Sequence, residues 1–185
     1  MKFCLLLIAI AAIQLAMADF DVFYLRNNRK IMEGYQILDP SQNICPDPKN
    51  TRLFMDKGDV SGDKVGIRCV GTGCRHFQDN DRVYDPSNIQ IMEMHLSNKP
   101  VIHWSKYLQD AGICVLLTRL AIYRDNVDGD RWEMYDVHGV PQGKCEPNSA
   151  DDGWFAHCRE WTGYRKMRCY NYYTADFINA HDRGW

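Results

Sequence analysis

The 185-residue sequence lacks the motifs that would assign a chemistry directly. It contains no Gly-x-Ser-x-Gly, no His-Glu-x-x-His and no phosphate-binding glycine loop, so no motif points to a serine hydrolase, a zinc protease or a nucleotide-binding protein. Neither sign of charge forms a long block among 22 basic and 24 acidic side chains, so nothing suggests a nucleic-acid partner or an anionic membrane surface. No Asn-x-Ser/Thr sequon occurs either, so we expect no N-linked glycan.

Long apolar runs are also absent after the first residues of the chain. Lys2 precedes an apolar run over residues 3–13, and Ala16-Met17-Ala18 places small residues where signal peptidase reads them. This run is too short to span a bilayer, and no later run is long enough to do so. We therefore predict a signal peptide over residues 1–18 and a single secreted, extracellular domain over residues 19–185, without a membrane span.

Cysteine is plentiful for a chain of this length. Of the eight cysteines, Cys4 lies in the predicted signal peptide, which leaves seven in the mature chain. In an oxidising compartment, three disulfides and one free thiol are the simplest arrangement. We predict that Cys114 is the free thiol, because it lies in the most apolar segment of the chain, where a thiol behaves as a small buried hydrophobe. The predicted disulfide-forming cysteines are Cys45, Cys69, Cys74, Cys145, Cys158 and Cys169, and their connectivity is left open.

Runs of β-forming residues around polar turns dominate the mature chain. The central one spans residues 113–138, with two apolar-rich runs around an Asp- and Gly-bearing centre, and we interpret it as a hairpin and the spine of a sheet. Similar patterns predict hairpins over residues 19–38 and 52–70 and a strand over residues 89–96. Short helices are expected over residues 105–111 and 175–181. The predicted fold class is therefore mainly β, with antiparallel hairpins forming a disulfide-stabilised sandwich or barrel with one or two short helices.

Two patterns resemble metal sites, and we reject both. The turns over residues 59–64 and 126–131 have oxygen-bearing side chains at the first three ligand positions of an EF-hand loop, but lack its glycine at position six and its glutamate at position twelve. Cys69, Cys74 and His76 are crowded like half of a zinc site whose second half is missing. We predict neither a metal nor a cofactor.

One pair of residues suggests acid–base catalysis. Glu93 and His95 lie two positions apart and would project from the same face of a strand, where they could share general-acid and general-base roles on a phosphodiester or glycosidic bond. This supports an alternative function as a small secreted, ribonuclease-like hydrolase. The residues that could complete such a site are His103, His138, His157 and Arg119.

The last 32 residues are rich in aromatic side chains. Exposed Trp and Tyr join a large apolar area to a polar group, which suits a binding surface. We therefore predict a non-catalytic, effector-like or lectin-like module that binds an extracellular protein or glycan. The predicted binding residues are Trp154, Trp161, Tyr164, Tyr172 and Trp185.

Overall fold

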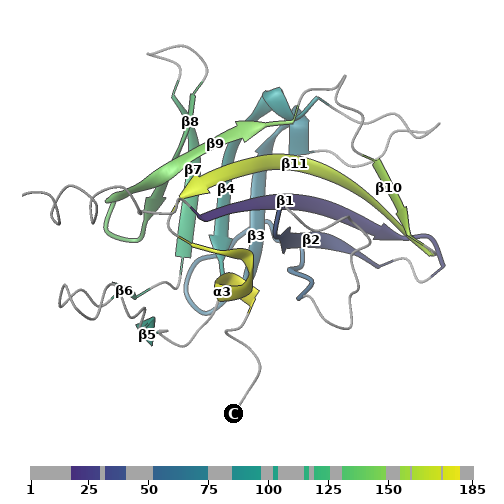
Figure 1. Ribbon diagram of the computed structural model, residues 1–185, viewed down its shortest axis with the longest axis horizontal. Coiled ribbons are helices and arrows are strands. Elements are labelled where there is room, and N and C mark those ends of the chain that lie inside the picture. The colour runs from purple at the N-terminus through teal and green to yellow at the C-terminus, as the bar shows by residue number, and fades with distance from the viewer. Residues whose placement is uncertain are drawn as a thin grey trace, which may run out of the picture.

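A computed structural model describes residues 18–29, 32–40, 52–74, 85–96, 102–103, 115–116, 119–125, 131–148, 155–158, 160–171 and 173–179. Its main sheet is antiparallel, with the strand order β2-β1-β11-β9-β8-β7-β4-β3, and β10 also pairs with β11 (Figure 1). The strands are β1 (Ala18–Asn27), β2 (Met32–Leu38), β3 (Gly66–Gly71), β4 (Ile89–His95), β7 (Arg119–Asp125), β8 (Arg131–Asp136), β9 (Pro141–Pro147), β10 (Phe155–Cys158) and β11 (Trp161–Asn171).

The segment over residues 52–57 links the two ends of this strand order. Phe54 exchanges two backbone hydrogen bonds with Tyr35 of β2, at 2.7 and 2.8 Å, and Asp56 forms a parallel bridge with Ile67 of β3. The sheet is therefore nearly closed and barrel-like. Gly34 permits the close approach, because a Cβ atom at this position would lie 2.5 Å from the carbonyl oxygen of Phe54.

This arrangement corrects the predicted hairpin over residues 52–70. The segment before the turn runs parallel to β3 at Asp56 and antiparallel to β2 at Phe54, so it is not the first strand of a local hairpin. Alternation of apolar and polar residues indicates that a segment is extended, but it does not indicate which strand the segment pairs with. Here the two end strands of the sheet offered unpaired backbone groups, and the segment satisfies some of them.

The other two predicted hairpins are confirmed. β1 pairs with β2 from Asp21↔Leu38 to Asn27↔Met32, and β7 pairs with β8 from Leu120↔Asp136 to Asp125↔Arg131. The central hairpin is shorter than predicted, because β7 begins at Arg119. Residues before it form β6 (Val115–Leu116), which pairs with β5 (Ile102–His103) in a separate two-stranded sheet.

The helical elements are short. Within the described ranges, the 3-10 helices are η1 (Thr72–Cys74) and η2 (Pro86–Asn88), and the α-helix is α3 (Ala175–Asn179). The predicted helix at the C-terminus is thus confirmed in its first residues, whereas the one predicted over residues 105–111 lies outside the described residues. The α3 helix packs buried Ile178 against the core and is held to β2 by a 2.7 Å hydrogen bond from Asn179 Nδ2 to the carbonyl oxygen of Ile37.

The main hydrophobic core lies inside the curved sheet. On β4, Met92 and Met94 face inward, as alternation predicts, and Leu96 follows them. Trp132 of β8 completes this region by donating a 2.9 Å hydrogen bond from Nε1 to the carbonyl oxygen of Ile89. A second, smaller cluster joins Phe23, Leu25, Leu38 and Trp161.

None of the helices among the described residues has the length and apolar character needed to cross a membrane.

Two disulfides are present in the described residues. Cys145 of β9 and Cys169 of β11 lie directly opposite each other and are bonded, and Cys69 is bonded to Cys74 across the end of β3. Four of the six predicted disulfide-forming cysteines are therefore confirmed, and the crowding of Cys69 and Cys74 reflects a disulfide. Cys45, Cys114 and the side chain of Cys158 lie outside the described residues.

Candidate functional site

A hollow of about 440 Å³ lies on the outer face of β3, β4 and β7. Arg68, Glu93 and Tyr123 line it, and each is next in sequence to a core residue that points into the sheet interior. The hollow therefore follows from strand alternation, which directs every second side chain outward.

The turn over residues 59–64 forms one wall of this hollow. Asp59 accepts hydrogen bonds from the Ser61 backbone N–H at 2.9 Å, the Ser61 hydroxyl at 3.0 Å and the Lys64 ammonium group. These contacts lower the pKa of Asp59. Gly62 has a φ of 61°, and its carbonyl oxygen accepts a hydrogen bond from Arg119 of β7. The turn predicted at this position is thus confirmed, and Arg119 ties it to the sheet.

The floor of the hollow carries an ion pair between neighbouring strands. Arg68 Nη1 lies 2.8 Å from Glu93 Oε2, and the two residues are directly paired in the β3–β4 register. Glu93 raises the pKa of the Arg68 guanidinium through this hydrogen bond.

The predicted acid–base pair is divided between two environments. Glu93 lines the hollow and binds Arg68, whereas His95 is only 3% exposed and does not line the hollow. Among the predicted partners, Arg119 lines the hollow, while His138 is exposed in the turn after β8. The side chains of His103 and His157 lie outside the described residues. A catalytic role for Glu93 and His95 stays a prediction.

A second hollow of about 430 Å³ continues the first across β7 and β8. The two share Ala121, Tyr123, Asp136 and Val137, and the second adds Tyr135 and Gly139. We refer to the pair of hollows as the Tyr123 groove, since Tyr123 lines both. The rings of Tyr123 and Tyr135 have centroids 6.2 Å apart and are tilted by 52°.

Asp136 shapes the end of the groove. Its Oδ1 accepts hydrogen bonds from the backbone N–H groups of His138 and Val140 at 2.8 and 2.9 Å, and its Oδ2 accepts one from Gln142 Nε2 at 3.0 Å. A carboxylate that bonds the backbone two and four residues onward stabilises a tight turn, and Gly139 adopts a φ of 74° within it. The turn over residues 136–140 is thereby held beside the groove.

Apolar surface gathers at this turn. Of the five large hydrophobic side chains exposed among the described residues, three lie in the groove or at its edge: Tyr123 (40% exposed), Val137 (49%) and Val140 (51%). Exposed apolar side chains that occur singly are ordinary, but a cluster rimmed by polar groups marks an interaction surface. The sequence offered a signal for this site that we did not use, namely a tyrosine on the outward face of each strand of the central hairpin.

Two of the five predicted aromatic binding residues are described by the structure. Trp161 and Tyr164 are buried, Trp161 in the smaller hydrophobic cluster and Tyr164 opposite Tyr24 in the β1–β11 register. Trp154, Tyr172 and Trp185 lie outside the described residues. The binding role of the C-terminal aromatic residues stays a prediction, and neither Trp161 nor Tyr164 lines the Tyr123 groove.

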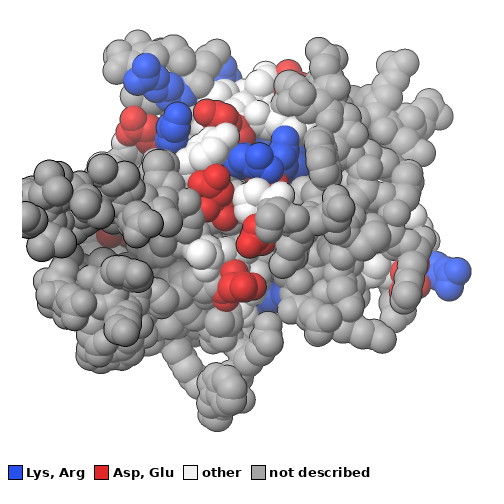
Figure 2. Space-filling model, viewed as in Figure 1, with Lys and Arg blue, Asp and Glu red and all other residues white. Residues whose placement is uncertain are grey.

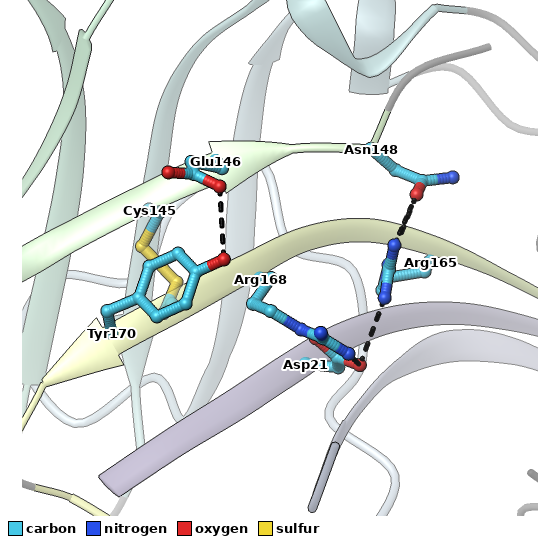
Figure 3. A network of polar contacts seen from close by, with 8 residues as sticks. Asp21, Cys145, Glu146, Asn148, Arg165, Arg168 and Tyr170 are labelled. Carbon is cyan, nitrogen blue, oxygen red and sulfur yellow. Dashed lines mark hydrogen bonds and ion pairs between the residues drawn. A yellow bond between two sulfur atoms is a disulfide. The ribbon is translucent and has the colours of Figure 1, made fainter. Parts of the chain in front are cut away.

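A polar network crosses the outer face of β1 and β11 (Figure 3). The buried carboxylate of Asp21 lies between two guanidinium groups, Arg168 at 2.8 Å and Arg165 at 3.4 Å. Arg165 also donates to Asn148 Oδ1, at 3.2 Å from Nε and 2.7 Å from Nη2. Because these groups bind one another across neighbouring strands, we interpret the network as a clamp on the sheet.

Lys166 is a charged residue of the interior. Its side chain is buried, its Nζ lies 2.8 Å from the carbonyl oxygen of Gly73 in η1, and it lies 5.5 Å from the ring centroid of Tyr164. Burial lowers the pKa of Lys166 to about 8. The contact joins β11 to the turn that the Cys69–Cys74 disulfide closes.

Among the described residues on the face shown in Figure 2, basic and acidic side chains are interspersed. Comparison with protein-family models, with curated proteins and with solved structures finds no match for this chain.

Proposed function

We propose that this protein binds an extracellular polypeptide through the Tyr123 groove and does not catalyse a reaction. The observation that carries the proposal is the clustering of Tyr123, Val137 and Val140, all at least 40% exposed, beside charged groups at one groove. Protein interfaces combine such aromatic and apolar anchors with a polar rim. The extracellular location of the partner rests on the predicted signal peptide and on the two disulfides, which are typical of oxidising compartments.

A polypeptide fits this groove better than a glycan does. Two exposed valines offer contacts to apolar side chains, which a chain of sugar hydroxyls does not supply. The two hollows also share four lining residues, so they offer neighbouring sites to consecutive side chains of one extended segment.

Peptide selection tests the proposal. We would pan a phage-displayed random peptide library on the full chain and measure binding of the enriched peptides to Tyr123→Ala, with Tyr170→Ala as the control. Tyr170 is also a partly exposed tyrosine on the outer face, but it lies on β11 and does not line the groove. We expect at least about a tenfold loss with Tyr123→Ala and unchanged binding with Tyr170→Ala, both variants keeping the wild-type thermal midpoint. Equal binding to wild type and Tyr123→Ala would contradict the proposal, as would selective glycan binding that both variants retain.

A secreted hydrolase using Glu93 and His95 is the second candidate. It is favoured by the position of Glu93 and Arg119 in one hollow, and we place it second because Glu93 is held in an ion pair and His95 is buried. It predicts cleavage of RNA or polysaccharide that His95→Ala abolishes without loss of stability. Absence of cleavage by the wild-type protein would remove it.

A further inference from the structure

We infer that one end of the Tyr123 groove takes the guanidinium group of an arginine from the bound polypeptide. This end is the hollow lined by Tyr123, Tyr135 and Asp136, which we call the aromatic-acidic subsite. The inference rests on the proposed function and adds the chemistry by which a partner segment would be selected.

The first argument is the composition of the subsite. It offers two tyrosine rings and one carboxylate, and none of the described residues that line it is basic. A cation placed over the face of a tyrosine is attracted by the ring quadrupole, and the attraction strengthens as the site loses water. Ring faces and a carboxylate in one hollow are therefore complementary to a positive group.

The second argument is the charge that this region leaves uncompensated. Within the described ranges, the carboxylates of Asp136 and Glu133 form no ion pair. Asp136 accepts hydrogen bonds from two backbone N–H groups and from the amide of Gln142, and Glu133 Oε2 accepts one from the Tyr135 hydroxyl at 2.7 Å. Both belong to β8 and flank Tyr135 in sequence. The nearby Arg68 is already neutralised by Glu93. Arg119, which lines the adjoining hollow, donates to the carbonyl oxygen of Gly62. An incoming cation could therefore pair with Asp136 without displacing an ion pair of that carboxylate.

The third argument distinguishes arginine from lysine. Asp136 Oδ2 accepts one hydrogen bond in the described structure, whereas a carboxylate oxygen can accept two. A guanidinium group can stack on a tyrosine ring and still donate along its edge to a carboxylate, whereas an ammonium group is a compact, strongly hydrated point charge. The exposed Val137 and Val140 beside the subsite would contact apolar neighbours of that arginine.

A set of four capped peptides tests this inference. They are Ac-Ala-Val-Ala-X-Ala-Val-Ala-amide with arginine, citrulline, lysine or glutamate at X, titrated into the ¹⁵N-labelled full chain and followed by amide shifts of residues 121–123 and 135–140. We expect the arginine peptide to bind at least about tenfold more tightly than citrulline, its neutral isostere, with lysine intermediate. The preference for arginine should weaken as the salt concentration rises.

Two pairs of variants locate the effect. Tyr135→Leu should remove the preference for arginine over citrulline, and Tyr135→Phe should retain it because the ring face remains. Asp136→Asn should also remove it, because the amide keeps an oxygen acceptor for the turn but loses the charge. Asp176→Asn, on the exposed face of α3 and outside both hollows, is the charge-matched control and should leave the preference unchanged.

The outcomes separate this inference from the proposed function. Equal binding of the arginine and citrulline peptides, with shifts in the groove, would overturn the aromatic-acidic subsite and leave the groove as a peptide site. An arginine preference that survives both Tyr135→Leu and Asp136→Asn would also overturn it. If none of the four peptides shifts the groove at millimolar concentration, the inference fails, and the phage selection decides the proposed function independently.

Discussion

Asp21 and Arg168 face each other across β1 and β11 and make two hydrogen bonds of 2.8 Å, one to each carboxylate oxygen (Figure 3). Arg165, which is paired with Phe23 of β1, lies 3.4 Å from the same carboxylate. Asp21 itself is only 1% exposed. The two guanidinium groups compensate the buried charge of the carboxylate. Removal of the carboxylate would leave both of them without their ion-pair partner.

We expect Asp21→Ala to lower the free energy of unfolding by about 3 kcal/mol or more, because it leaves two guanidinium groups without their shared carboxylate. Urea denaturation followed by circular dichroism measures this change. Lys64→Ala breaks the exposed pair between Lys64 and Asp59 and is the control, because a solvent-exposed pair contributes little and the free energy of unfolding should stay nearly unchanged. Similar losses in the two variants would show that the network is not a clamp.

Lys166 should make stability depend on pH in the alkaline range. Its folded pKa of about 8 lies below the unfolded value of about 10.4. The unfolded state therefore binds more protons between these two values, and stability rises as the pH increases through this window. The contribution between pH 7 and pH 9.5 is about 2 kcal/mol.

The measurement compares urea denaturation of wild type and Lys166→Met at these two pH values. Other titrating groups are common to both proteins, so the difference between the two pH responses isolates Lys166. We expect the wild type to gain about 2 kcal/mol more than the variant. Parallel pH responses would show that the Lys166 pKa is not depressed in the folded protein.

The two disulfides should differ in their contribution to stability. Cys145–Cys169 closes a loop with a sequence separation of 24, and Cys69–Cys74 one with a separation of 5. Because a longer loop loses more entropy on closure, we expect double-alanine removal of the first bond to cost about 3.5 kcal/mol and of the second about 2 kcal/mol. Thermal and urea denaturation of the two variants provide the test, and the reverse order would contradict it.

Gly34→Ala tests the link between the two ends of the sheet. The added methyl group would lie 2.5 Å from the carbonyl oxygen of Phe54, so we expect a loss of about 1–3 kcal/mol and faster amide exchange at Tyr35 and Phe54. Gly58→Ala is the matched control, since no atom lies within 4 Å of its Cβ position. Equal stability of both variants would mean that residues 52–57 do not hold the sheet nearly closed.

Local patterns in the sequence predicted β1, β2, β4, β7 and β8, but not β9, β10 or β11. Alternation and turn chemistry predicted the hairpins β1–β2 and β7–β8, the strand β4 and the turn over residues 59–64, because these depend on residues close together in the chain. The polar setting of the cysteines also predicted four that form disulfides, but not their pairing.

Only the tertiary structure decided which distant segments meet. Phe54 joins Tyr35 because near-closure of the sheet brings its two end strands together, and Asp21 meets Arg165 and Arg168 because β11 returns beside β1. The Tyr123 groove likewise combines a wall, a floor and a turn from separate parts of the chain. Periodicity assigns a side chain to a face of its own strand, but its neighbours on that face are set by strand order and register, which depend on the packing of the whole sheet.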